Sequence, residues 1–268
     1  MIVMSDSRKK TDNKSNWIIN FDKIEDSTRR NYFSVLPQEN RLMEFFSEAF
    51  VINKPKGSVG GDGFWLHNHG DDVYLALFTC VGEGHLASMM IRIYMNALKK
   101  MVEGYSIDFT GSILQFLHRE VQARFKDKNN ILLNTNANVG IVKLNTKTKE
   151  MEFAGANMDL LQVHRRGIKI VKGEEMQVGE KRELRSNYTS ISLEDAADSS
   201  FYLCSTGVFN LIGGPNFKKL SKEQLAEYLR EHRKDTLLDQ KRLTEDYLAT
   251  WTGANRQNDD IMVIGFKA

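Results

Sequence analysis

Residues 73–88 read VYLALFTCVGEGHLAS, an apolar and β-branched run that breaks at a Gly-Glu-Gly-His turn and continues into small residues and methionines. The run predicts a buried strand, and the recurrence of apolar residues at helical spacing from Ala87 onward predicts a helix after the turn. A strand that ends in a glycine turn before a helix places the residues at its tip where they can take part in a functional site. Thr79, Cys80, Glu83 and His85 are therefore the first residues to consider for a functional site.

A second strand is predicted just before this one, in KPKGSVGGDGFW at residues 54–65. Gly60 and Gly61 stand directly before Asp62, and glycine in a strand pattern indicates close approach of another backbone or a ligand, so we expect an accessible carboxylate. The polar turn HNHGDD at residues 67–72 then predicts a hairpin with VYLALFT. We interpret its two histidines, His67 and His69, as solvent-exposed turn residues.

The remaining elements follow from periodicity and from turn residues. Short amphipathic helices are predicted at 26–36 and 40–49, a strand at 50–54, and two core-facing helices over about 87–101 and 113–125. Six strand-like runs then succeed one another, which favours antiparallel pairing: VGIVKLN, EMEFAGAN, LLQVHRR, IKIV, YTSISL and SSFYLCST. Ser221 with Gln224 forms a capping-box pattern that predicts a helix, and paired aspartates lead into the final strand, IMVIGF.

Length and composition predict one globular domain. The chain has 268 residues, of which 41% are hydrophobic and 27% charged, and no linker-like segment divides it. We expect a disordered polar N-terminal tail at residues 1–16 and a domain at 17–268, with a helical lead-in at about 26–49 and a core at 50–268.

The charge balance excludes some classes of partner. With 37 Lys and Arg against 35 Asp and Glu, the net charge of +2 predicts no binding to nucleic acid or to an anionic membrane surface.

The N-terminus has no apolar stretch long enough for a signal peptide or a membrane span. The two cysteines, Cys80 and Cys204, lie in apolar runs, as core thiols do in a reducing compartment, so we expect a cytoplasmic protein.

Five segments, in order and at their spacing, carry a family resemblance: KPKGSVGGDGFW, GEGHLAS, FAGANMDLL, FYLCSTGVFNLIGGPNFKKLS and QNDDIMVIGF. Over roughly residues 50–268 the chain resembles the SpoIIE-type branch of the metal-dependent protein serine/threonine phosphatases, which have the protein phosphatase 2C fold. The resemblance implies an α+β fold, a four-layer α-β-β-α sandwich of two antiparallel sheets. It also implies a dinuclear Mn²⁺ or Mg²⁺ centre held by aspartates at one end of the sandwich.

The resemblance places four aspartate ligands on this sequence, and only two are present. Asp62 and Asp259 match the first and the last of them, as metal ligands that would be weak or vestigial. The two middle positions fall on Thr79 and Thr206, so we interpret these residues as vacated ligand positions. No residue is assigned a catalytic role.

The lost carboxylates matter because hard divalent cations need anionic oxygen ligands, and a threonine hydroxyl supplies oxygen without charge. Each loss removes an attraction of about 4 kcal/mol per unit charge at an effective dielectric constant near 20. Glu83, which stands where the family usually has histidine, is the one nearby carboxylate available as a replacement ligand, and Asn210 stands where a further acidic residue often follows.

Two functions stay open from the sequence. In the first, the domain has lost its dinuclear centre, needs no cofactor and acts as a catalytically inactive or impaired regulatory protein-binding module in bacterial-type signalling. Its partner would then be a protein such as a small phosphorylatable antagonist of a partner-switching pathway. In the second, it is an active, divergent phosphoserine/phosphothreonine protein phosphatase that holds Mn²⁺ or Mg²⁺ through Asp62 and Asp259, with Asp260 or Glu83 as a further ligand.

Overall fold

The computed structural model describes residues 27, 29–82, 84–124, 135–181 and 187–268. The expected N-terminal tail at 1–16 and the turn residue Glu83 lie outside this set. Within it, no helix is both long enough and apolar enough to cross a lipid bilayer.

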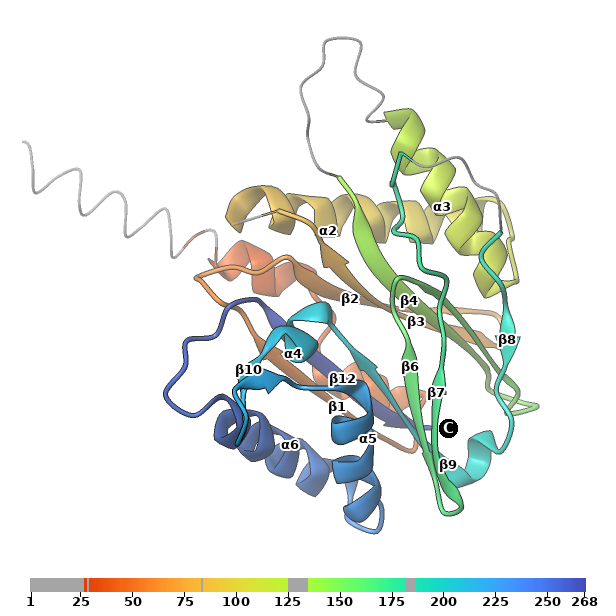
Figure 1. Ribbon diagram of the computed structural model, residues 1–268. Coiled ribbons are helices and arrows are strands. Elements are labelled where there is room, and N and C mark those ends of the chain that lie inside the picture. The colour runs from red at the N-terminus through yellow and green to blue at the C-terminus, as the bar shows by residue number, and fades with distance from the viewer. Residues whose placement is uncertain (1–26, 28, 83, 125–134, 182–186) are drawn as a thin grey trace, which may run out of the picture.

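Two five-stranded antiparallel sheets form the centre of the molecule (Figure 1). The first sheet has the strand order β1-β12-β9-β6-β7, and its strands are β1 (Glu48–Lys54), β6 (Leu160–His164), β7 (Gly167–Val171), β9 (Ser199–Cys204) and β12 (Ile261–Lys267). The second has the order β2-β3-β4-β5-β8, with β2 (Asp62–His69), β3 (Asp72–Cys80), β4 (Ala137–Asn145), β5 (Met151–Ala156) and β8 (Ile191–Ser192). VYLALFT lies in β3 and IMVIGF in β12, and each is an interior strand of its sheet, as predicted.

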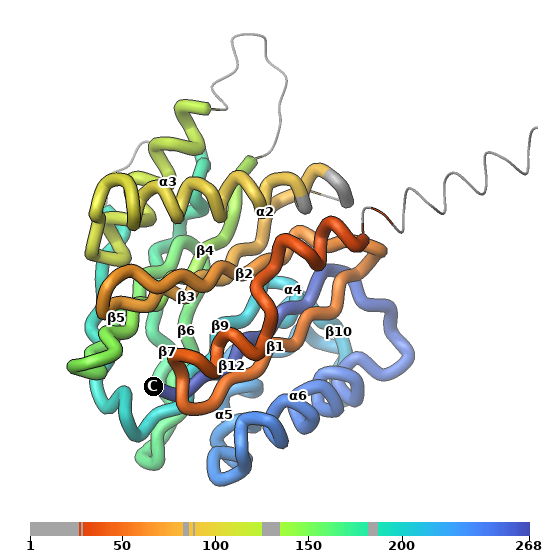
Figure 2. The backbone as a smooth tube through the Cα atoms, turned by 180° about the vertical axis from the view of Figure 1, so that it is seen from behind, coloured from red at the N-terminus to blue at the C-terminus, as the bar shows by residue number. Residues whose placement is uncertain are grey.

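Helices cover the outer face of each sheet (Figures 1 and 2). Helices α2 (Gly84–Lys99) and α3 (Thr110–Arg124) pack on the second sheet, whereas α5 (Lys222–Glu231) and α6 (Leu237–Thr252) pack on the first. The smaller elements are 3₁₀ helices at Glu39–Glu44 and Ala196–Asp198, a π turn at Lys100–Gly104, helix α4 (Thr206–Asn210), and a hairpin of β10 (Ile212–Gly213) and β11 (Lys218–Lys219). The predicted four-layer α-β-β-α sandwich is therefore confirmed.

Capping residues set where α5 and α6 begin. The Ser221 hydroxyl accepts from the backbone N–H of Gln224, whose side chain accepts from the backbone of Ser221, so the predicted capping box is confirmed. Helix α6 was not predicted, although it carries a similar signal. Its N-cap, Thr236, accepts from the backbone N–H of Asp239.

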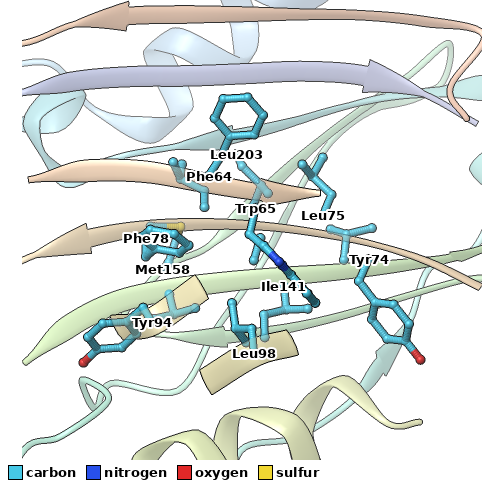
Figure 3. Close-up of a cluster of buried hydrophobic side chains, with 14 of the residues drawn as sticks. Phe64, Trp65, Tyr74, Leu75, Phe78, Tyr94, Leu98, Ile141, Met158 and Leu203 are labelled. Carbon is cyan, nitrogen blue, oxygen red and sulfur yellow. The ribbon is translucent and has the colours of Figure 1, made fainter. Parts of the chain in front are cut away.

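The core has one layer between the second sheet and its helices, another between the two sheets, and a third between the first sheet and α5 and α6. Figure 3 shows part of it, with Phe78 of β3 stacked on Tyr94 of α2 at a centroid distance of 6.1 Å. On the other face of that sheet, a Cβ at Gly140 would lie 3.0 Å from the side chains of Leu203 and Met158. The residues of β4 that share the face of Gly140 therefore point toward the first sheet.

The helix predicted at 40–49 is correct only in its first half, where a 3₁₀ helix covers Glu39–Glu44, and wrong after it. A 3₁₀ helix ends at Glu44 and strand β1 begins at Glu48, because the backbone there pairs with the C-terminal strand, with Val51 opposite Ile264. This pairing joins segments about 200 residues apart, which no local periodicity can reveal.

The solvent-exposed interpretation of the turn histidines holds for His69 and is wrong for His67. The His67 ring is only partly exposed, stacks on Trp65 at 5.1 Å, and places its Nε2 3.1 Å from a carboxylate oxygen of Glu103.

Candidate functional site

Three polar residues lie side by side across the second sheet at the end where β2 begins. Strand register places Asp62 opposite Thr79, and Thr79 opposite Asn138. Asn138 is two residues from Gly140, so by strand alternation it faces the first sheet, as do its two neighbours in the row. The row therefore points into the space between the sheets.

The first sheet contributes the residues that follow β9. Ser205 precedes helix α4, and Thr206 is its first residue. The side-chain amide of Asn138 donates to Thr206 Oγ1 at 2.6 Å, which ties the two sheets together at this point. Thr79 and Thr206, the two positions identified from the sequence, thus both lie beside the same asparagine.

Side-chain amides extend this contact into a network. The Oδ1 of Asn138 accepts from Nδ2 of Asn157 and from Nε2 of Gln177, each at 2.8 Å. Two donors to that oxygen fix the orientation of the amide, so its N–H groups face Thr206. None of the three amides was predicted from the sequence, although Asn157 lies inside the segment FAGANMDLL.

The carboxylate of Asp62 is buried, so the expectation that it is accessible is wrong. The residue is 0% exposed, and neither carboxyl oxygen has a hydrogen-bond partner among the described residues. Burial raises the pKa of the Asp62 carboxyl well above its usual range; the hydroxyls of Ser205 and Thr79 lower it, and the charges of Asp260 and Asp259 raise it. Both hydroxyls act on the pKa of Asp62, although neither makes a hydrogen bond of normal geometry to its carboxyl oxygens.

The glycines before Asp62 lie in close contact with other parts of the chain. A Cβ on Gly61 would lie 2.8 Å from the backbone oxygen of Cys80, and one on Gly60 would lie 3.0 Å from the carboxyl carbon of Asp260. The prediction that the glycines permit a close approach is correct. The groups that approach them belong to the protein itself.

The paired aspartates before β12 have different surroundings. One oxygen of Asp260 accepts from the backbone N–H of Lys56 at 2.7 Å, and the other accepts from that of Gly61 at 2.6 Å. Asp259 accepts from Nδ2 of Asn210 at 3.2 Å and from the backbone N–H of Asp260 at 2.9 Å. Asp260 therefore holds the loop before β2, whereas Asp259 faces the position where the family often has another acid.

The described donor set does not fit a dinuclear metal centre. Among the described residues, no three His, Cys, Asp or Glu side chains are grouped as a metal site requires. Both Asp260 oxygens are occupied by backbone amides, and the Thr206 hydroxyl accepts from Asn138. The unpartnered carboxylate of Asp62 is the feature that a cation would suit, and Glu83, the other acid considered, lies outside the described residues.

No model of a known protein family and no curated protein matches the sequence. Among solved structures, the SiaA-PP2C domain of Pseudomonas aeruginosa is 24% identical and superposes with a TM-score of 0.81 over 93% of this chain and 98% of that domain. A structure of the SpoIIE PP2C phosphatase domain with a fragment of its regulatory domain, from Bacillus subtilis, is 14% identical, with a TM-score of 0.67 over 82% of this chain and 62% of that chain.

A further match is RsbX in complex with magnesium, which is 17% identical, with a TM-score of 0.55 over 82% of this chain and 94% of that chain. At these identities the likeness establishes the fold. The chain has the PP2C phosphatase fold, as the sequence resemblance predicted.

Proposed function

We propose that this domain is a regulatory protein-binding module that retains the PP2C fold without its dinuclear metal centre. The observation that carries the proposal is the Asn138–Thr206 hydrogen bond. In this bond a neutral amide donates to the hydroxyl at the position where the resemblance implies a carboxylate ligand, and the threonine oxygen is used as an acceptor. An N–H group directed at this position disfavours a cation there.

The electrostatics of Asp62 support the same function. A dinuclear centre would hold this carboxylate in its charged form, whereas burial without a partner favours the protonated form. Without two metal ions the site has neither an activated water nor a clamp on the oxygens of a transferring phosphoryl group. The proposed function of the fold is then to bind a protein partner. The first candidate for this partner is a small phosphorylatable antagonist protein, phosphorylated or not.

Restoring the ligands tests the vacated positions. Thr79→Asp, Thr206→Asp and the double variant are titrated with Mn²⁺ by calorimetry beside the wild type, with Thr148→Asp in an exposed turn as the matched control. We expect no micromolar binding by the wild type or the control. The double variant should gain far more affinity than the two single variants together, because carboxylates that share an ion are coupled.

Binding of a candidate antagonist protein, in both phosphorylation states, is then measured in the presence of a chelator. Binding without release of phosphate supports a metal-independent module. If the wild type binds Mn²⁺ at micromolar strength and the double variant gains nothing, the threonines are not vacated ligand positions and the proposal fails.

A second function is favoured by one observation, the unpartnered carboxylate of Asp62. A bound cation would satisfy it, and a divergent phosphatase with one metal held by Asp62 and Asp259 would use it. This function requires Mn²⁺-dependent hydrolysis of an aryl phosphate by the wild type and its loss in Asp62→Asn. Hydrolysis that persists in Asp62→Asn excludes it.

A further inference from the structure

A pocket of about 400 Å³ lies at the opposite end of the first sheet from the candidate site. Strand β9 connects the two places, because Ser200 near its start lines the pocket and Ser205 follows its end. At about 3.3 Å per residue, five residues of strand separate them by about 17 Å. The pocket therefore does not belong to the site described above.

The pocket lies on the face of the sheet that α5 and α6 cover. Val163 and Ser200 are paired across β6 and β9, and Lys267 at the end of β12 follows Phe266, the partner of Phe201. Val163 belongs to the apolar layer beneath α5 and α6, so side chains in its row point toward these helices. Arg233, in the connection between the two helices, closes the other side.

Four basic side chains from three parts of the fold line this pocket: Arg165 after β6, Arg233 and Lys234 between the helices, and Lys267 of β12. Lys267 is neutralised by Glu48, whose carboxylate lies 2.7 Å away. Arg165, Arg233 and Lys234 have no carboxylate partner among the described residues, and Asp198 is the acidic residue of the lining. Cationic groups thus outnumber anionic ones in a concave space.

We propose that this pocket binds a small phosphorylated ligand. Arg165, Arg233 and Lys234, which lack a carboxylate partner among the described residues, suit a group that carries two or more negative charges, and the planar guanidinium of arginine matches phosphate oxygens in geometry. The volume is within the range of small-molecule sites, and the buried Ser200, whose side chain shares the face of Val163, suits a polar ligand better than an apolar one. The proposal is independent of whether the PP2C site holds metal.

The test is calorimetric titration of the full chain with inorganic pyrophosphate, adenosine diphosphate and adenosine, in a chelator so that metal complexes do not contribute. We expect saturable binding of the first two compounds, one per chain, and none of adenosine. The double variant Arg165→Gln with Arg233→Gln should weaken pyrophosphate binding at least tenfold. Lys234→Glu, at an exposed side chain, should do the same without disturbing packing.

The matched control is Lys218→Gln with Lys219→Gln, which removes the same charge from exposed positions of β11. It should leave pyrophosphate affinity unchanged if the pocket is the site. Equal weakening by both double variants would mean a general charge effect and overturn the proposal. Absence of saturable binding of pyrophosphate and of adenosine diphosphate at millimolar concentration would overturn it as well.

Discussion

Replacing Asp260 by asparagine is expected to destabilise the folded protein substantially, whereas the same change at Asp259 is not. Each Asp260 oxygen accepts a backbone N–H, from Lys56 at 2.7 Å and from Gly61 at 2.6 Å. An asparagine keeps one acceptor and turns an N–H₂ group toward the other amide. The buried amide of Gly61 or the exposed amide of Lys56 then loses its partner.

A hydrogen bond to a charged acceptor contributes about 1.5–3 kcal/mol, and a buried donor left unpaired costs about 1–3 kcal/mol. Asp260→Asn removes one such bond and weakens the other, so we expect a loss of about 2–3 kcal/mol in the free energy of unfolding. Asp259 is also partly exposed, but it accepts a longer bond of 3.2 Å from the side-chain amide of Asn210 and a bond from its own neighbour in the chain. We expect Asp259→Asn to cost less than about 1 kcal/mol.

Urea unfolding followed by circular dichroism, in chelator at pH 7, measures both variants against the wild type. Each change removes one negative charge that raises the pKa of Asp62, so the comparison isolates the hydrogen bonds. Hydrogen exchange of the Gly61 amide, faster in Asp260→Asn alone, locates the effect. Equal losses in the two variants, or no loss in Asp260→Asn, would refute the assignment of Asp260 as the residue that holds the loop.

Three further predictions concern single substitutions. Burial raises the pKa of Asp62 above the value of about 3.9 that it has in an unfolded chain. The contribution of this group to stability is therefore fully present below about pH 4. As the pH rises from there toward the pKa in the folded state, the free energy of unfolding of the wild type falls by up to about 1.4 kcal/mol per pH unit. Urea unfolding from pH 4 to 8 should show this loss in the wild type and not in Asp62→Asn, and parallel curves would contradict it. Gly207→Ala should lower the free energy of unfolding by about 3 kcal/mol or more, because its Cβ would lie 1.8 Å from the backbone oxygen of Asp260. Gly57→Ala, whose Cβ would have its nearest contact at 3.8 Å, is the control in the same unfolding assay. Ser221→Ala should cost about 1 kcal/mol through loss of the α5 cap, measured by thermal unfolding, and an unchanged midpoint would count against the cap.

Local patterns predict much of this fold, because apolar runs bounded by turn residues are a local property. VYLALFT and IMVIGF are buried on both faces, and their continuous apolar character shows it directly. The segment at 40–49 shows the limit of such patterns. Its apolar residues fit a helical period, yet pairing of β1 with β12 decides the conformation.

The position of the candidate site is a prediction from the resemblance, and its contacts come from the structure alone. The resemblance points to Thr79 and Thr206, and the structure places both beside Asn138. The bond from Asn138 to Thr206 joins residues 68 positions apart, and the bond from the Gly61 amide to Asp260 joins residues 199 positions apart. Neither contact leaves a local signal in the sequence.

The close backbone contacts at the glycines bear on how this domain can change over evolutionary time. Gly61 and Gly207 admit no side chain because backbone atoms of Cys80 and Asp260 fill the space, so most mutations at these codons impair folding. A change between aspartate and threonine at a ligand position needs no such rearrangement of the main chain. Selection for a foldable protein alone therefore preserves these backbone contacts, while the polar side chains of the candidate site are free to change under a different selection.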